Sequence, residues 1–345
     1  MTNNFQISHP ISSPGRTNTS SPKHASRQEY IHKRMQERGV LSFVAKQNIS
    51  IRMLFLMMLA TSMLVACSKA DSPIDEPEIT YINGITRVFE YLPAPGQFIN
   101  TMPEATADDT PETMRQKTEE ALKDGRMICL GGFGGYIVFG FDHTIINREG
   151  NDFVILGNAI NIWAEPGVIM VSVDVNGNGL PDDEWYEIAG SEYHKTTTIK
   201  NYEITYYKPE SEPSNPNEPN YIRWTDNQGQ TGYLSKVGAH TQPYYPLWAG
   251  ESYTLKGTFM EANVDDVSGN GANWVNAAYE WGYADNWGNN DVKAQIDIDW
   301  AVDKNGNPVK LKSIDFVRVH TGNRAEGGWL GEVSTEVSGF TDLNL

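Results

Sequence analysis

Hydrophobic positions after residue 126 recur in short runs that alternate with polar positions, a pattern typical of β-strands whose two faces meet different surroundings. In 296–300 apolar and acidic residues take opposite faces, and in 316–320 the side chains of Arg318 and His320 share one face. The predicted strands are 136–141, 153–156, 168–173, 185–188, 202–207, 221–225, 253–259, 295–302, 314–320 and 332–338. Short strands separated by Gly, Pro and Asn turns predict a mainly β fold, a β-sandwich or jelly roll.

The segment before these strands has a different pattern. Residues 81–103 contain strand formers interrupted by proline and glycine, which predicts extended structure. A short helix is predicted over 110–126, where Thr110 is a good N-cap and Pro111 suits the first helical position. We therefore expect 81–126 to form an extended segment plus a helix, packed on or leading into a main domain of residues 127–345.

The first 66 residues are predicted to be a leader and signal peptide. Residues 53–66 form an apolar run of 14 residues that follows basic residues. A membrane-spanning helix needs about 20, so the run fits the hydrophobic region of a secretory signal. It ends in Leu-Val-Ala-Cys, which resembles a bacterial lipobox, and this implies lipidation of Cys67 after cleavage. Because a signal peptide begins its protein, we expect translation to start at Met35 or Met53.

Removing this leader changes the charge of the chain. The leader holds eight of the 27 Lys/Arg and two of the 44 Asp/Glu, which leaves 19 basic and 42 acidic residues and a formal charge of −23. Such a surface repels nucleic acid, which excludes nucleic-acid partners. With Cys67 lipidated, only Cys129 remains, so no intramolecular disulfide is expected. An exported chain of this kind depends on its core, on bound metal, or on both.

Residues 67–80 form an acidic, proline-containing tether with little to bury. An acidic run directly after a lipidated cysteine resembles the surface-export signal of Bacteroidota lipoproteins. This resemblance implies an outer-membrane protein anchored at the cell surface through Cys67, with the periplasmic leaflet as the alternative.

An oxygen-rich loop lies between the predicted strands 168–173 and 185–188. Oxygen side chains occur at alternate positions around Gly177 and Gly179, which suits the six to eight oxygen ligands of calcium. The last position of an EF-hand loop would be Trp185 rather than glutamate, so the loop is not an EF-hand. The predicted ligands are Asp174, Asn176, Asn178, the Leu180 carbonyl and Asp182. The alternative is a solvated hairpin turn without metal, since Asn-Gly pairs favour turns.

The segment 263–291 combines Asn, Asp and Gly with aromatic residues, and aromatic faces beside amides suit a sugar or another large polar–apolar ligand. The predicted ligand-binding residues are Trp274, Trp281, Tyr283, Trp287 and Trp329. Within this segment Asp285, Asn286, Asn289 and Asp291 are candidates for a second cation site. The alternative is that the aromatic side chains fill the edge of the sandwich.

Signals for catalysis are weak. The chain has no Gly-x-Ser-x-Gly motif, and the four histidines after residue 66 are not spaced as zinc ligands. Carboxylates near aromatic residues are candidates for the acid–base pair of a glycoside hydrolase, namely Glu165, Glu187, Glu280, Glu332 and Glu336. With 42 acidic residues, however, proximity in sequence carries little information, so we expect no catalytic residues.

Five stretches resemble a family of Bacteroidota cell-surface lipoproteins, often associated with PKD-like domains. These stretches are 135–145, 173–193, 296–311, 314–322 and 328–340, and the resemblance spans 127–345. Relatives in that family often accompany outer-membrane transporters, including those for cobalamin. The resemblance therefore implies a TonB-dependent transporter as partner. It identifies no catalytic residues, and the chain has too few residues between Cys67 and Met127 for a complete additional domain.

Together these observations predict a surface-anchored lipoprotein that binds a ligand without chemistry. The expected role is capture of a nutrient, cobalamin or a glycan, for a transporter, with calcium bracing the loop 174–182. The alternatives are a secreted-type glycoside hydrolase that uses paired carboxylates and a structural or adhesive surface protein.

Overall fold

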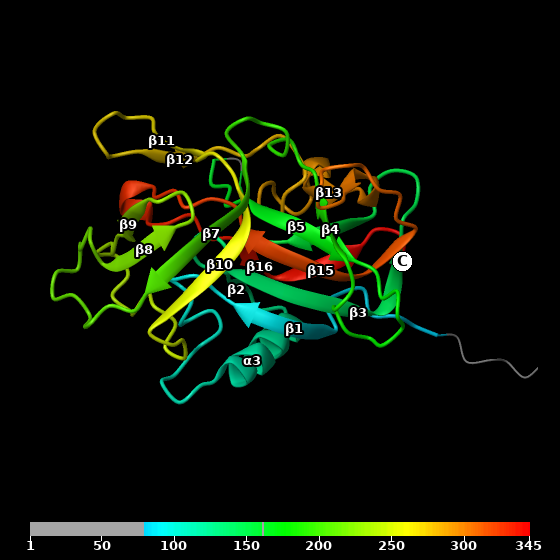
Figure 1. Cartoon of the computed structure of the whole chain (residues 1–345), viewed down its shortest axis with the longest axis horizontal. Helices are drawn as coiled ribbons and strands as arrows, with labels where there is room; N and C mark the ends of the chain where they lie inside the picture. Colours follow the sequence, from blue (N-terminus) through cyan, green and yellow to red (C-terminus); the bar gives the residue numbers. More distant parts are fainter. Residues whose placement is uncertain (1–78, 161) are drawn as a thin grey trace, which may run out of the picture. The chain divides into compact units, whose positions relative to one another are not determined.

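The computed structural model describes residues 79–160 and 162–345 (Figure 1). Most of the secondary structure in these residues consists of antiparallel β-strands. The predicted leader 1–66, the lipidation site Cys67 and the tether up to residue 78 lie outside these residues. No helix in the described part of the chain has the length and apolar character needed to cross a membrane.

A six-stranded antiparallel sheet organises the fold, in the order β1-β3-β15-β5-β6-β14. Its strands are β1 (Arg87–Leu92), β3 (Tyr136–Ile146), β15 (Ser313–Thr321), β5 (Gly167–Ser172), β6 (Trp185–Ile188) and β14 (Ala301–Val302). Strand β15 lies inside the sheet, between β3 and β5. Its two-residue period places Val317 and Val319 in one core, while Arg318 and His320 face the opposite side, as the sequence predicts.

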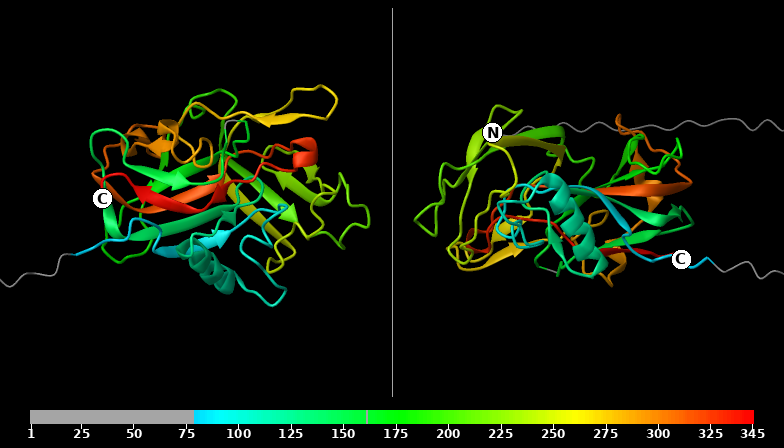
Figure 2. Two further views of the ribbon diagram at one scale, coloured as in Figure 1. Left: turned by 180° about the vertical axis from the view of Figure 1, so that it is seen from behind. Right: turned by 90° about the horizontal axis from the view of Figure 1, so that it is seen from below.

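One face of this sheet packs against a second, smaller sheet. The smaller sheet has the order β13-β4-β17, and a further strand pair, β16-β2, lies beside it (Figures 1 and 2). These strands are β13 (Gln295–Ile296), β4 (Phe153–Leu156), β17 (Gly339–Asp342), β16 (Glu336–Val337) and β2 (Ile128–Cys129). The shared core is aromatic and aliphatic: the Phe340 ring centroid lies 6.1 Å from that of Phe139 and 5.2 Å from that of Phe153.

The opposite face carries a second core under a four-stranded sheet with the order β10-β7-β8-β9. Its strands are β10 (Ser252–Phe259), β7 (Ile199–Tyr207), β8 (Ile222–Asp226) and β9 (Thr231–Leu234). Phe133 packs edge-on against Tyr202 in this core, with ring centroids 5.0 Å apart. The hairpin of β11 (Val264–Asp266) and β12 (Trp274–Asn276) projects beyond the sheets (Figure 1). The mainly β, sandwich-like fold predicted from the sequence is confirmed.

The predicted helix is present as α3 (Pro111–Lys123). Thr110 is its N-cap and forms a capping box with Thr113, in which each side chain accepts from the backbone N–H of the other residue. The helix buries Met114 and Leu122 and lies against β1 (Figure 1). Its polar face also holds the edge of the sheet, because Glu119 accepts a hydrogen bond from the Val88 N–H at 2.9 Å and Arg115 donates to the Val88 carbonyl at 2.6 Å.

Two predicted strands differ from the structure. The alternating segment 295–302 is not continuous, because a 3₁₀ turn (Ile298–Trp300) separates β13 from β14. The Asp297 carboxylate accepts a hydrogen bond from the Asp299 N–H at 2.8 Å and so caps this turn. An aspartate that bonds to backbone two residues ahead stabilises a turn in place of a strand ladder. The predicted strand 332–338 is likewise reduced to β16.

Candidate functional site

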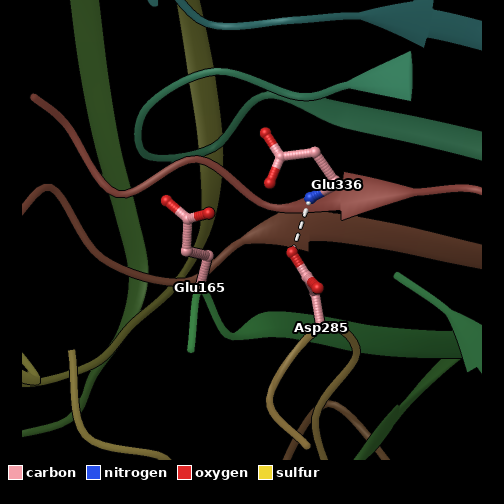
Figure 3. Close-up of side chains that lie close together, drawn as sticks. All are labelled: Glu165, Asp285 and Glu336. Carbon is pink, nitrogen blue, oxygen red and sulfur yellow. Dashed lines mark hydrogen bonds between the residues drawn. The ribbon is translucent and has the colours of Figure 1, made fainter. Parts of the chain in front are cut away.

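Three carboxylates from distant parts of the chain meet beside the β16-β2 pair. Glu165 precedes β5, Asp285 lies in the long loop after β12, and Glu336 begins β16. One carboxylate oxygen of each residue lies within 4.8 Å of the others, and Asp285 and Glu336 are buried while Glu165 is half-buried (Figure 3). We call these three residues the acidic trio.

Backbone amides hold the acidic trio in place. One oxygen of Asp285 accepts from the N–H groups of Asn158 (2.8 Å) and Ala159 (2.9 Å), and the other accepts from Glu336 N–H at 2.9 Å (Figure 3). Asp285 has a positive φ of 49°, a conformation that costs energy for a residue other than glycine. Glu165 accepts from the Ser334 N–H at 3.0 Å. These contacts fix the carboxylates of Asp285 and Glu165, and the Glu336 carboxylate accepts from the Ser334 hydroxyl at 2.9 Å.

Burial raises the pKa of every member of the acidic trio. Desolvation is the main cause in each case, and the neighbouring carboxylates raise the pKa of Glu165 and Glu336 further. Within the described part of the chain, no lysine, arginine or histidine forms an ion pair with the trio. Because burial disfavours the charged forms and no cation compensates, the trio retains protons near neutral pH.

A cavity of about 590 Å³ opens onto the trio, and we call it the acidic pocket. Besides Glu165 and Glu336 it is lined by Glu332, whose pKa burial raises to about 8. Four buried side-chain oxygens around this cavity accept no hydrogen bond, namely Gln97 Oε1, Asn276 Oδ1, Glu332 Oε2 and Glu336 Oε2. A buried polar atom without a partner is costly, so two amide acceptors and two protonated carboxyls around one cavity indicate a place that a ligand completes.

Apolar side chains form the remaining wall of the acidic pocket. Phe98, Ile160 and Trp163 line it, and the Trp163 side chain is 45% exposed. An accessible indole beside several acceptors suits a ligand with both apolar and hydroxyl or ammonium groups. Three carboxylates at this separation are also a donor set that a hard divalent cation prefers.

The predicted calcium loop lies elsewhere, between β5 and β6. Asn176 and Asn178 each donate a side-chain hydrogen bond to Asp182, at 2.9 and 3.0 Å. The Asp174 carboxylate accepts from Asn178 N–H at 3.0 Å and from Gly179 N–H. The predicted side-chain ligands therefore converge, and Leu180 adjoins them through its N–H bond to Asn178 at 2.7 Å. The arrangement is compatible with a bound cation and equally with a turn held by its own hydrogen bonds.

The predicted aromatic residues do not form one surface. Trp281 packs on Trp300 with ring centroids 4.6 Å apart, and Tyr283 is buried with its hydroxyl accepting from Glu192 N–H. Trp287 donates to the Tyr279 carbonyl and stacks beneath Lys293. Trp329 is 54% exposed and approaches the β11–β12 hairpin that carries Trp274. Most of these side chains fill the edges of the sandwich, the alternative that the sequence left open.

The aromatic segment nevertheless contributes Asn276 to the lining of the acidic pocket and Asp285 to the acidic trio. The predicted second cation site does not form around Asp285. Asn286 and Asn289 instead bond the backbone of Tyr279 and Gly157, and Asp291 caps a 3₁₀ turn (Val292–Ala294).

Comparison of the sequence with protein-family models found no match, and a search of curated proteins found no significant relative.

Proposed function

We propose that the chain is a surface-anchored lipoprotein that binds a glycan in the acidic pocket without changing it chemically. The observation that supports this proposal is that four residues lining one cavity, two amides and two carboxyls, each have a side-chain oxygen without a hydrogen-bond partner. Sugar hydroxyls both donate and accept hydrogen bonds, so a bound sugar suits amide acceptors and protonated carboxyls together. The side chains of Gln97 and Asn276 supply neutral acceptors, which do not depend on pH.

The dimensions and walls of the acidic pocket support the same ligand. Its volume of about 590 Å³ lies within the range of about 300–1,000 Å³ common for small-molecule sites. Trp163 offers an exposed indole on which a sugar ring stacks. Cobalamin, with its corrin ring and nucleotide, is larger than this cavity encloses, so the pocket favours the glycan over the other predicted nutrient.

The biological role we propose is nutrient capture at the cell surface, followed by transfer to a TonB-dependent outer-membrane transporter. The lipobox-like ending at Cys67, the acidic tether and the family resemblance support this role.

A second candidate, a glycoside hydrolase, is favoured by one observation. Glu332, with a pKa of about 8, and Glu165, whose pKa is also raised, line the same cavity as Trp163. Protonated carboxyls near neutral pH are suited to general-acid catalysis. However, Glu165 and Glu336, which both line this cavity, have carboxylate oxygens within 4.8 Å of each other, less than the separation of about 5–5.5 Å or more in such enzymes. Binding without hydrolysis is therefore the proposal we prefer.

Calorimetric titration of the full chain with a panel of oligosaccharides, and separately with cobalamin, tests the proposal. We expect saturable binding of at least one glycan, recovered intact, and a loss of about tenfold in affinity (1.4 kcal/mol) in Trp163→Ala. The matched control is Trp329→Ala, which removes an exposed tryptophan outside the pocket lining. Absence of heat with every glycan refutes glycan capture, and release of shorter sugars establishes the hydrolase instead.

We also propose that calcium braces the loop 174–182. The convergence of Asp174, Asn176, Asn178 and Asp182 supports this. Calcium at 100 times its dissociation constant adds about 2.7 kcal/mol to stability, so EDTA should lower Tm by several degrees. Asp182→Asn should abolish the EDTA effect, whereas Asp266→Asn, in another exposed turn, should retain it. An unchanged Tm on chelation shows that the loop is only a turn.

A further inference from the structure

A second cavity, of about 230 Å³, lies between the two larger sheets, and none of its lining residues belongs to the acidic pocket. Met170, Glu187 and Arg318 contribute from the six-stranded sheet, and Lys200 and Lys256 contribute from β7 and β10. We call this cavity the basic groove. Because both sheets form its walls, the groove is part of the folded framework.

The charge of the basic groove is opposite to that of the protein. Four of its lining residues are cationic, Lys200, Lys256, Lys304 and Arg318, and two are acidic, Glu187 and Asp303. After residue 66 the chain has 19 basic and 42 acidic residues. Cations gathered at one groove of such an acidic chain indicate local selection for an anion rather than the general composition of the surface.

Arg318 is the central cation of the basic groove. Among the described residues its Nε is buried without a hydrogen-bond partner, and its terminal nitrogens contact only the Lys256 carbonyl at 3.4 Å and the Met170 sulfur at 4.0 Å. The guanidinium stacks on Tyr136, 4.3 Å from the ring centroid. No carboxylate of the described residues forms an ion pair with it. A desolvated guanidinium with free donors requires an acceptor that the protein does not supply.

The acids of the groove are already engaged. Glu187 accepts from Lys200 Nζ at 3.1 Å and from the Thr258 hydroxyl at 2.6 Å. Asp303 accepts from the backbone N–H groups of its own turn, including that of Asn305 at 2.8 Å. Burial lowers the pKa of Arg318, and Glu90 lies close enough to oppose this shift, but Glu90 forms no ion pair with it among the described residues and instead accepts from the Tyr136 hydroxyl at 2.7 Å. Lys304 is exposed at the groove and forms no ion pair within the described residues.

We propose that the basic groove binds a small molecule through an oxyanion, a carboxylate or phosphate group, with Arg318 as its principal partner. The planar guanidinium presents parallel N–H donors that match such groups, and Lys304 adds charge at the entrance. Trp185 and Tyr193 line the groove and provide apolar surface for the organic part of the ligand. The groove's volume suits a small metabolite rather than a polymer.

Titration of the full chain with inorganic phosphate and with succinate, at constant ionic strength, tests this inference and distinguishes the two oxyanions. We expect saturable binding of at least one probe. Affinity should fall at least about tenfold in Arg318→Gln, because charged hydrogen bonds are lost. It should fall about two- to fivefold in Lys304→Gln, which removes a solvent-exposed charge.

Two controls separate this inference from other effects. Lys312→Gln removes an exposed cation outside the groove and should leave the affinity unchanged. Lys304 is exposed, so Lys304→Gln still tests oxyanion binding in the groove if Arg318→Gln fails to fold. Lack of saturable binding up to about 10 mM, ten times a dissociation constant of 1 mM, overturns the inference. An equal loss in Lys304→Gln and Lys312→Gln overturns it as well. Glycan binding in the acidic pocket is independent of every one of these results.

Discussion

Replacing Glu332 by glutamine should change how the stability of the protein depends on pH. Glu332 is buried, its Oε1 accepts from the Gln97 N–H at 2.7 Å, and its Oε2 has no partner. Burial raises the pKa of its carboxyl from 4.5 to about 8. Glutamine keeps the size of the side chain and an oxygen for the Gln97 N–H, but it cannot ionise. The substitution therefore removes the titration and preserves the packing.

The sign and magnitude of the effect follow from proton linkage. Between pH 4.5 and about 8 the unfolded chain has lost the Glu332 proton while the folded chain retains it. Folded protein then binds more protons than unfolded protein, so the free energy of unfolding falls as pH rises through this window. Each pH unit costs about 1.4 kcal/mol, and the whole window about 5 kcal/mol. Below pH 4.5 Glu332 is protonated in both states, so none of this stability has been lost.

Urea unfolding at pH 5, 6, 7 and 8 measures this effect. We expect Glu332→Gln to lose stability with rising pH more slowly than the wild type, and to become the more stable of the two by pH 8. Part of the slope should remain, because burial raises the pKa of the acidic trio as well. Glu280→Gln, at an exposed position, should retain the full wild-type slope. Parallel curves for wild type and Glu332→Gln would refute the reasoning.

Three further changes test the fold by urea unfolding at neutral pH. Thr110→Ala should cost about 1 kcal/mol, because it removes the helix N-cap; an unchanged midpoint contradicts the capping role. Phe139→Ala should cost about 3–5 kcal/mol through the cavity it leaves in the core, and a loss below 1 kcal/mol would show that the core collapses around it. Gly135→Ala should prevent native packing, because its Cβ would overlap the Leu130 carbonyl. Gly250→Ala, with open space around it, should be nearly neutral, and equal losses in the two glycine variants contradict the steric argument.

Local pattern predicts the elements of this fold well because the signals that form them are local. Strands β4 (Phe153–Leu156) and β6 (Trp185–Ile188) have the predicted bounds, and the helix begins where its N-cap and proline indicate. The wrong prediction at 295–302 also arises from a local signal, which was read as a strand although it forms a turn. Alternation of apolar and acidic residues describes a strand, but the Asp297 side chain bonds to the backbone of Asp299 and turns the chain. Alternation alone does not distinguish these outcomes.

The candidate site is much less predictable because its residues are far apart in the sequence. Glu165, Asp285 and Glu336 come from three segments and meet only when β5 and β16 take their places in the fold. Each was a candidate in the sequence, although Asp285 was assigned to a cation site that does not form. Nothing local distinguishes these acids from the others. The sequence also does not show which aromatic side chains are exposed. The buried Tyr283 and a solvent-facing tryptophan occur in similar Gly- and Asn-rich surroundings.

The contacts between α3 and β1 limit the association of neighbouring copies of this protein. An edge strand with free N–H and carbonyl groups recruits strands from neighbouring chains. Here Glu119 and Arg115 occupy the outward N–H and carbonyl of Val88, and at the other edge the Val309 N–H bonds the Ala301 carbonyl of β14. Under the lipid anchoring that we propose, copies would share one plane at high local density, where edge-to-edge pairing would build fibres. By occupying these edge groups, the helix prevents edge-to-edge pairing, so each copy stays separate and its pockets stay open to solution.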